Sequence, residues 1–236
     1  MARSALREDR DVTPGSGIVF LLDVDNTLLD NDRFAADLSL RLESAFGEIQ
    51  RKRYWDLFAT LRDELGRADY LAALQAFRTG LEDRPELLHM SEFMLEYPFA
   101  QLCFPSALEA VAHLSQLGRT VVLSDGDIVF QPRKVQRSGI WDSVEGRVLI
   151  YLHKERSLDD VQRHYPAAHY VMVDDKPNLL AAMKTRLQNK LTTVFVQQGH
   201  YAQSAQMDAI DPPPDRVIER IGDLRDHSIK DFLEGR

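Results

Sequence analysis

Two aspartates, Asp23 and Asp25, stand one residue apart directly after a run of five apolar residues, 18–22. A short apolar run of this kind is typical of a strand that is buried on both faces of a sheet. Carboxylates at the end of such a strand are costly unless they bind a ligand or do chemistry. A turn or a helix-capping cluster is the structural alternative, but the buried strand before the pair favours a functional role.

Polar side chains follow three further apolar runs in the second half of the chain. They are Ser124 after 120–123, Lys154 after 148–152, and Asp174 with Asp175 after 170–173. Helical patterns separate these runs, which indicates βαβ units and a parallel sheet. Ligands bind at the carboxyl ends of the strands in such sheets, so we expect these residues to converge on one crevice.

The helical patterns fall into two groups. Between 31 and 104, apolar residues recur at helical spacing, with Gly47, Gly66 and Gly80 where helices could end and Pro85 where a fourth could begin. No strand is predicted in this stretch. Beyond it, we expect helices at 106–117, 132–139, 157–165 and 178–187, and a fifth strand at 192–196. Ser157 is a candidate N-cap of its helix.

These patterns divide the chain into three parts. Residues 1–16 are polar and end in a Pro- and Gly-containing stretch, which predicts a loose tail. Residues 17–30 and 105–236 are expected to form one α/β core. Residues 31–104 interrupt the alternation of strand and helix and are expected to form an all-helical block.

The order of these motifs resembles that of the haloacid dehalogenase superfamily. Asp-x-Asp-x-Thr at 23–27 follows the first strand, and serine, lysine and an Asp-Asp pair follow the next three. The resemblance covers about residues 18–196 and includes an insertion after the first motif, like the helical caps of that superfamily. It implies an α/β fold with a Rossmann-like parallel sheet core and an inserted α-helical cap, and a phosphatase acting on a small phosphorylated metabolite.

The resemblance also assigns catalytic roles. Asp23 would attack phosphorus and form an aspartyl phosphate. Asp25 would protonate the leaving oxygen and then deprotonate the attacking water. Mg²⁺, which prefers oxygen ligands, would be bound by Asp23, the backbone carbonyl of Asp25, and Asp175. The dehalogenases lack an aspartate at the position of Asp25, so its presence favours phosphoryl transfer.

A second set of residues would bind the phosphoryl group. The resemblance implies hydrogen bonds from Ser124 and the amide of Asp125 to its oxygens. Thr27, which orders the loop after the first strand, is grouped with these substrate-binding residues. Lys154 would neutralise charge on Asp23 and on the phosphoryl group.

Lys134, Lys176 and Arg133 are the rivals for the role of Lys154. Lys154 is preferred because it follows an apolar strand and opens a helix. Arg51-Lys52-Arg53 is expected to be a solvated helix face, with guidance of an anionic substrate as the alternative. His113, His153, His164, His169 and His200 show no metal-ligand spacing.

The motif at 174–178 departs from the superfamily pattern. It lacks a glycine, and the spacing from the aspartates to Asn178 is compressed. This leaves open which aspartate binds the metal. Asp175 is favoured as the metal ligand, with Asp174 as the alternative. Either Asp174 or Asn178 would then orient the ligand without binding the metal itself.

Composition limits the partners of the chain. A net charge of −8 and a pI near 5.4 argue against a nucleic-acid-binding protein. No apolar stretch approaches the ~20 residues that span a bilayer, so no membrane association is expected. Cys103 is the one cysteine, which excludes an intrachain disulfide and fits a reducing, cytoplasmic location. The oligomeric state has no signature in the sequence.

Other functions on the same fold remain open. A phosphomutase or phosphotransferase would use the same aspartyl phosphate while excluding water. A 2-haloacid dehalogenase is disfavoured by Asp25. A non-catalytic binding protein is the alternative from another class, because fold does not determine function.

Overall fold

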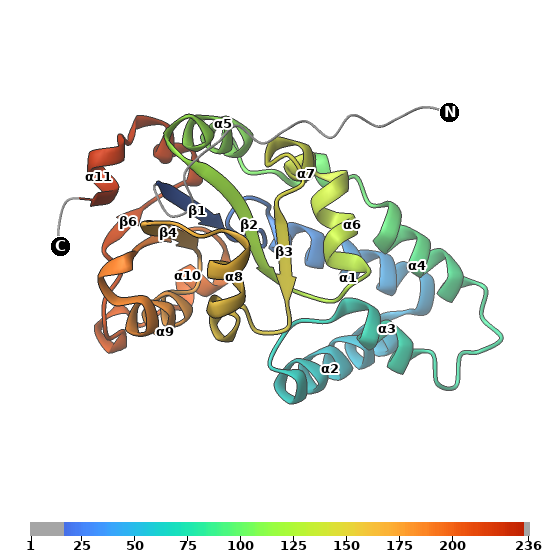
Figure 1. Ribbon diagram of the computed structural model, residues 1–236. Helices are drawn as coiled ribbons and strands as arrows, with labels where there is room; N and C mark the ends of the chain where they lie inside the picture. Colours follow the sequence, from blue (N-terminus) through green and yellow to red (C-terminus); the bar gives the residue numbers. More distant parts are fainter. Residues whose placement is uncertain (1–16, 234–236) are drawn as a thin grey trace, which may run out of the picture.

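The computed structural model describes residues 17–233, so the tail expected at 1–16 lies outside the described residues. Six parallel strands form one sheet in the order β3-β2-β1-β4-β5-β6 (Figure 1). They are β1 Ile18–Leu22, β2 Arg119–Asp125, β3 Val148–Tyr151, β4 His169–Asp174, β5 Leu191–Val196 and β6 Arg216–Ile218. The parallel α/β core is therefore confirmed, and the five expected strands are present.

The sixth strand, β6, was not predicted. It is three residues long and pairs with β5 through Val194, Phe195 and Val196. Its short, partly polar sequence and the prolines before it carry no strand pattern. The segment forms a strand because it pairs with the free edge of β5, and not because of its own sequence.

Helices cover both faces of the sheet. One face packs against α5 Ala107–Leu117, α6 Phe130–Arg137, α7 Ile140–Ser143 and α11 Ile229–Leu233, and the other against α8 Leu158–His164 and α9 Pro177–Leu187. The alternation within β1 shows why: Phe20 and Leu22 belong to the first apolar cluster, whereas Val19 and Leu21 belong to the second. Since both faces are buried, every residue of β1 is apolar.

The stretch 31–104 is helical, as expected. It contains α1 Asn31–Phe46, α2 Glu48–Leu65, α3 Tyr70–Phe77 and α4 Glu86–Glu96, followed by a 3-10 turn at Phe99–Leu102. Asp30 caps α1 by accepting a hydrogen bond of 2.9 Å from the amide of Arg33. Gly66 ends α2 in the left-handed conformation, with φ of 68°, which glycine adopts without strain.

Two local predictions need correction. Ser157 stands directly before α8, but its hydroxyl donates to the carbonyl of His153 and does not cap the helix. Lys154 opens a 3-10 turn, Lys154–Arg156, and not a longer helix. The short turn is enough to reverse the chain between β3 and α8.

The chain enters and leaves the helical insertion side by side. Leu29 forms an antiparallel bridge with Cys103, and the amide of Asp30 donates to the carbonyl of Leu102 at 2.8 Å. The amide of Phe104 donates in turn to the carbonyl of Leu28 at 3.0 Å. The two connections therefore close the base of the insertion near the expected boundaries at 30 and 105.

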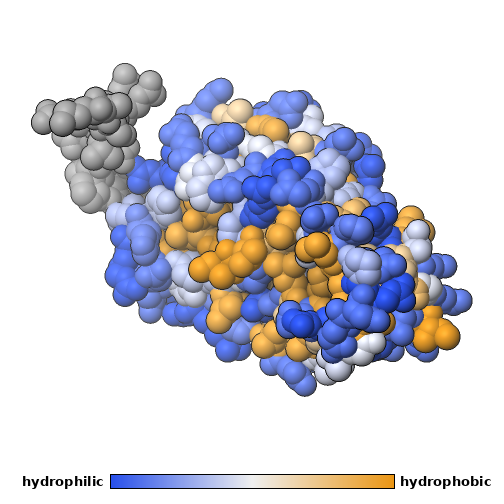
Figure 2. Space-filling model, turned by 90° about the vertical axis from the view of Figure 1, so that its right-hand side faces the viewer, coloured by the Kyte–Doolittle hydropathy of each residue, from blue (hydrophilic) through white to orange (hydrophobic). Residues whose placement is uncertain are grey.

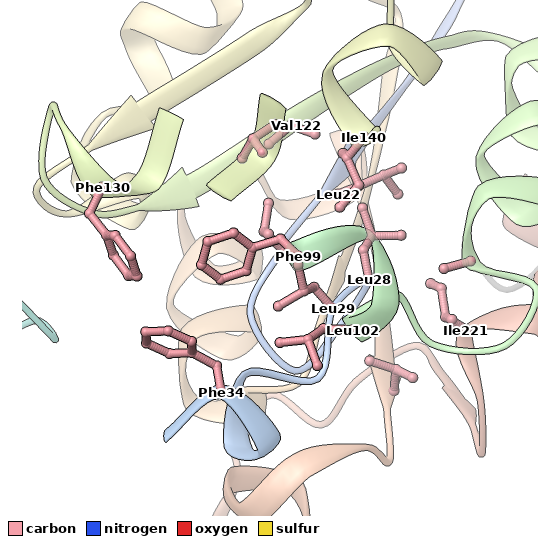
Figure 3. Packing of buried hydrophobic residues seen from close by; sticks show 14 of the residues in the cluster. Leu22, Leu28, Leu29, Phe34, Phe99, Leu102, Val122, Phe130, Ile140 and Ile221 are labelled. Atoms are coloured by element: carbon pink, nitrogen blue, oxygen red, sulfur yellow. The ribbon is translucent and has the colours of Figure 1, made fainter. Parts of the chain in front are cut away.

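One apolar cluster nevertheless runs from the sheet into the insertion. The ring of Phe34, on α1, lies 5.4 Å from those of Phe99 and Phe130 and 5.2 Å from that of Tyr70. Figure 3 shows Phe34, Phe99 and Phe130 facing one another beside Leu22 and Val122 of the sheet. The division into a separate core and cap stays a prediction, because the two parts share this cluster.

The surface of the insertion is mixed in character. Figure 2 shows the face on the right of Figure 1, with apolar residues gathered in its middle and hydrophilic ones around them. Leu40, Ile49 and Leu88 are exposed apolar residues of α1, α2 and α4. Within residues 17–233, no helix is both long and apolar enough to cross a bilayer.

We expect the substitution Phe34→Ala to lower the free energy of unfolding by about 3–5 kcal/mol, because it empties a fully buried site between the insertion and the sheet. Urea unfolding followed by circular dichroism and by tryptophan fluorescence measures the change. The two signals should report one shared transition in the wild-type protein. A loss below ~1 kcal/mol, or separate transitions of insertion and sheet, would contradict the shared cluster.

Candidate active site

The polar ends of four strands meet at one edge of the sheet. β1 lies between β2 and β4, and β3 lies beside β2. The amide of Asp23 continues the ladder by donating to the carbonyl of Val173 at 3.0 Å. Because all the strands are parallel, their carboxyl ends bring together Asp23, Ser124, Lys154 and the pair Asp174 and Asp175.

Lys154 lies at the centre of this group and is fully buried. Its Nζ donates to Asp23 Oδ1 and pairs with Asp174 Oδ2 at 2.7 Å. Its backbone amide donates to Asp125 Oδ1 at 2.7 Å. Burial alone lowers the pKa of the Lys154 ammonium, but the carboxylates of Asp174, Asp23 and Asp125 outweigh it and raise the pKa above its usual range. The side chain therefore stays charged beside Asp23.

Three buried carboxylates face this one ammonium. Oxygens of Asp23, Asp174 and Asp175 all lie within 4.8 Å of one another. Burial, opposed by Lys154, raises the pKa of Asp174. Burial and the neighbouring charges of Asp174 and Asp23 raise the pKa of Asp175 more strongly. The cluster thus carries more buried negative charge than Lys154 alone can balance.

The unpaired oxygens of this cluster fit a cation. Asp23 Oδ2 and both oxygens of Asp175 are buried and have no hydrogen-bond partner within residues 17–233. Asp174, in contrast, pairs with Lys154 and accepts the amide of Lys176 at 2.9 Å. Hard oxygen donors of this type suit Mg²⁺, and a divalent ion would offset the excess charge. Asp175 is therefore the freer of the two neighbouring aspartates.

Asp25 sits beside the cluster in a separate set of contacts. Its Oδ1 accepts a hydrogen bond of 2.7 Å from Lys134 Nζ, and its Oδ2 accepts a longer one of 3.4 Å from Gln131 Nε2. The same amide of Gln131 donates to the hydroxyl of Ser124 at 2.9 Å. Asp25 is partly exposed, whereas Lys134 and Gln131 are buried. One helix, α6, thus supplies both partners of the Asp25 carboxylate.

A cavity of about 920 Å³ opens in front of Asp25 and Asp125. Aromatic side chains and charged side chains of both signs line it, and they come from the insertion, from α6 and from the rest of the core. They include Trp55, Phe58, Tyr70, Phe130, Tyr201, Arg62, Arg67, Lys176, Asp32, Asp127, Glu155, His153 and His200. The insertion approaches the core so closely here that a Cβ atom added to Gly66 would lie only 2.8 Å from His153 Cε1. The helices of 31–104 therefore lie over the strand ends and not remote from them.

Other predicted residues lie as follows. Thr27 is fully buried, and its Oγ1 has no partner among the described residues, so its part in substrate binding rests on the resemblance alone. Ser124 is buried. Its hydroxyl donates to the carbonyl of Asp125 at 3.3 Å and accepts a hydrogen bond from Gln131 Nε2. Asn178 lines the cavity at the start of α9. Arg51 pairs with Glu43 and does not line the cavity.

The three residues that the sequence offered as alternatives to Lys154 make different contacts. Arg133 points away, donating to Glu96 and the carbonyl of Leu95. Lys176 lines the cavity; burial lowers the pKa of its ammonium, but Asp23 and Asp174 outweigh this and raise it. Lys134 reaches Asp25 and not Asp23. Two lysines therefore contact the first motif, whereas the sequence was interpreted as placing one there, with Lys134 as a rival for the same position.

Sequence reasoning also missed Gln131, Arg67, His153 and His200. Gln131 and Lys134 are one turn apart on α6, and this spacing was the only available signal for a shared face. The histidines were judged by metal-ligand spacing, which does not apply to a cavity wall. Their place in the wall follows from how the insertion sits on the core.

Comparison with known proteins gives a consistent result. A family model of haloacid dehalogenase-like hydrolases matches residues 19–185. A crystal structure of a haloacid dehalogenase-like hydrolase from Burkholderia xenovorans LB400 is similar at 55% sequence identity and a TM-score of 0.87. The similarity covers 92% of this chain and 99% of that one. No curated protein matches the chain.

More distant structures share the fold. An L-2-haloacid dehalogenase from Xanthobacter autotrophicus is similar at 19% identity and a TM-score of 0.57, over 88% of this chain and 96% of that one. A magnesium-bound hydrolase from Bacillus subtilis, whose structure is described as revealing interdomain movement, is similar at 14% identity and 0.62, over 93% and 99%. Both types of enzyme are thus built on this architecture.

We expect Asp175→Asn to stabilise the metal-free protein by about 1–3 kcal/mol. The substitution removes a carboxyl group whose ionised form is destabilised by burial and by Asp174 and Asp23, and its amide can donate to an unpaired oxygen of the cluster. Urea unfolding in excess chelator measures this. Saturating Mg²⁺ should then stabilise the wild type but not the variant. Loss of stability in chelator, or an equal response of both proteins to Mg²⁺, would contradict a cation site at Asp175.

Proposed function

The chain belongs to the haloacid dehalogenase-like hydrolases, and we propose that it is a Mg²⁺-dependent phosphomonoester hydrolase that forms an aspartyl phosphate on Asp23. The substrate would be a small phosphorylated metabolite. One observation carries the proposal. A second carboxylate, Asp25, stands beside a buried cluster whose free carboxylate oxygens fit a divalent cation.

Asp23, Asp175 and the backbone carbonyl of Asp25 would hold the metal, with Asp174 as the alternative ligand. Bound there, Mg²⁺ would supply positive charge that lets an anionic phosphate approach an anionic nucleophile. Lys154 supplies the same kind of charge from the protein side, since it contacts Asp23 Oδ1 directly. The contact also keeps the carboxylate of Asp23 in one orientation.

In the first half-reaction a carboxylate oxygen of Asp23 attacks phosphorus, and the bond from phosphorus to the leaving oxygen breaks. Asp25 gives its proton to that oxygen, so an alcohol leaves and not an alkoxide. Ser124 and the amide of Asp125 donate hydrogen bonds to the transferring oxygens. The hydroxyl of Ser124 is held for this role by Gln131.

In the second half-reaction water attacks the phosphorus of the aspartyl phosphate. Asp25, now ionised, accepts a proton from that water, and the bond from phosphorus to Asp23 breaks. Inorganic phosphate leaves and Asp23 returns to a carboxylate. Asp25 is ready for another cycle because it regains in this step the proton that it gave in the first.

The leaving group would occupy the cavity in front of Asp25. Its lining combines aromatic side chains with charged side chains of both signs, and part of it comes from the insertion. We propose that 31–104 acts as a cap that opens for exchange of substrate and product and closes to exclude bulk water. The close approach of Gly66 to His153 supports a closed arrangement in this structure.

Asp25 is the main argument against a dehalogenase, since a halide leaves without a proton. The similarity to dehalogenases at 19% identity concerns the fold. A phosphomutase or phosphotransferase would need the same residues, and only product analysis separates it from a hydrolase. A cytoplasmic location and the absence of nucleic-acid partners belong to this proposal.

The direct test is turnover of a panel of phosphorylated metabolites, with 2-chloropropionate as the competing substrate class. We expect phosphate release with Mg²⁺ and none in excess chelator. Asp23→Asn should lower turnover by roughly 10³-fold or more, as removal of a covalent nucleophile does. Circular dichroism should show an unchanged fold. Chloride release without phosphatase activity, or near wild-type turnover by the variant, would refute the proposal.

A leaving-group series separates Asp25 from Asp23. We expect Asp25→Asn to slow the first chemical step by roughly 10²–10⁴-fold for an alkyl phosphate and far less for 4-nitrophenyl phosphate, whose phenolate leaves without protonation. Aspartyl phosphate should accumulate in the variant with the activated ester, because its hydrolysis also needs Asp25. Single-turnover kinetics measures both effects. An equal loss across the series would mean that Asp25 is not the acid.

A further inference from the structure

The face of α6 toward the active site presents two side chains to one carboxylate. Lys134 and Gln131 are one turn apart, and they reach different oxygens of Asp25. The geometry leaves the carboxylate few orientations. Its exposed part still borders the cavity in which the leaving group would lie.

Lys134 is unusual because its ammonium is completely buried. Burying an unpaired ammonium is energetically costly, so its position depends on good partners. Asp25 Oδ1 at 2.7 Å and Asn31 Oδ1 at 2.9 Å are two of them. The rings of Phe130 and Tyr70, whose centroids lie 5.1 and 5.9 Å from Nζ, add cation–π contacts.

Asn31 is itself held in place. Its amide nitrogen donates to the hydroxyl of Tyr70 at 3.0 Å, and its backbone amide donates to Asn26 Oδ1 at 3.0 Å. Lys134 is therefore fixed from the side of the helical insertion, through α1 and α3, as well as from α6. A side chain that is anchored at this many points can hold its partner in a defined position.

We propose that Lys134 is a positioning residue for Asp25, which keeps the acid/base carboxylate aimed at the leaving oxygen. This inference rests on the proposed function. A displacement of about 1 Å can cost on the order of 10²-fold in rate, so a fixed partner matters for proton transfer. Lys154 and Lys134 would then divide the first motif between them, one serving the nucleophile and the other the acid/base.

The test compares Lys134→Met, Lys134→Arg and the control Arg133→Met, a neighbouring cation on α6 that contacts Glu96 outside the site. With an alkyl phosphate, Lys134→Met should slow the first chemical step by about 10²-fold, with KM and the Mg²⁺ half-saturation changed by less than about threefold. With 4-nitrophenyl phosphate the loss should be smaller. Lys134→Arg should recover part of the rate, and Arg133→Met should stay within about twofold of wild type.

The double variant with Asp25→Asn decides the mechanism. If Lys134 acts through Asp25, adding Lys134→Met to Asp25→Asn should slow the first step by less than about threefold. Fully additive losses would overturn the proposal. So would a raised KM with unchanged kcat. If Lys134→Met does not fold, Asn31→Ala removes one anchor of Lys134 and should give the same selective loss.

Thermal unfolding without metal gives a second measurement that needs no turnover. The double variant should melt no lower than the worse of the two single variants, because each alone breaks the same ion pair. If the losses in melting temperature of the two single variants add in the double variant, while the wild-type protein hydrolyses phosphomonoesters, only the proposed role of Lys134 is overturned and the proposed function stands. If the losses in melting temperature do not add, but the wild-type protein hydrolyses no phosphomonoester, the proposed function is refuted, and the proposed role of Lys134 is refuted with it.

Discussion

The buried group of three carboxylates around Lys154 is the constraint on which the rest of the site depends. Asp23, Asp174 and Asp175 lie at the ends of two neighbouring parallel strands, where the sheet allows no water to surround them. Lys154 alone cannot balance three such charges in a medium of low polarity, and even with Lys176, whose pKa Asp23 and Asp174 raise, two ammonium groups face three carboxyl groups. In the proposed function the fold tolerates this cost because the excess charge would give the site its affinity for a cation.

The two carboxylates of the first motif have different surroundings, although one residue separates them. Asp23 is buried and contacts Lys154, whereas Asp25 is partly exposed and contacts Lys134 and Gln131. In the proposed mechanism this difference fits their roles. A nucleophile needs one fixed position, and an acid/base needs access to both the leaving group and water.

The helical insertion is tied to this chemistry by polar and apolar contacts alike. Asn31, the first residue of α1, accepts from Lys134 and donates to Tyr70. Phe34, one turn later, packs against Phe99 of the insertion and against Phe130 of α6 in the core. Any movement of the insertion must keep or break these contacts, so the position of the insertion and the geometry around Asp25 are linked through the same few residues.

The sequence alone determined the parallel sheet, the helical stretch at 31–104 and the convergence of Asp23, Ser124, Lys154 and Asp174 with Asp175. These features are local, because a buried strand and the residue that ends it are readable from a few neighbours. Only the tertiary structure decided that Lys134 and Gln131 contact Asp25, that Arg67, His153 and His200 line the cavity, and that β6 exists. A lysine on a helix looks like any solvated lysine until the packing of that helix removes it from water. A segment of three residues forms a strand only by pairing with the edge of an existing sheet, here with β5.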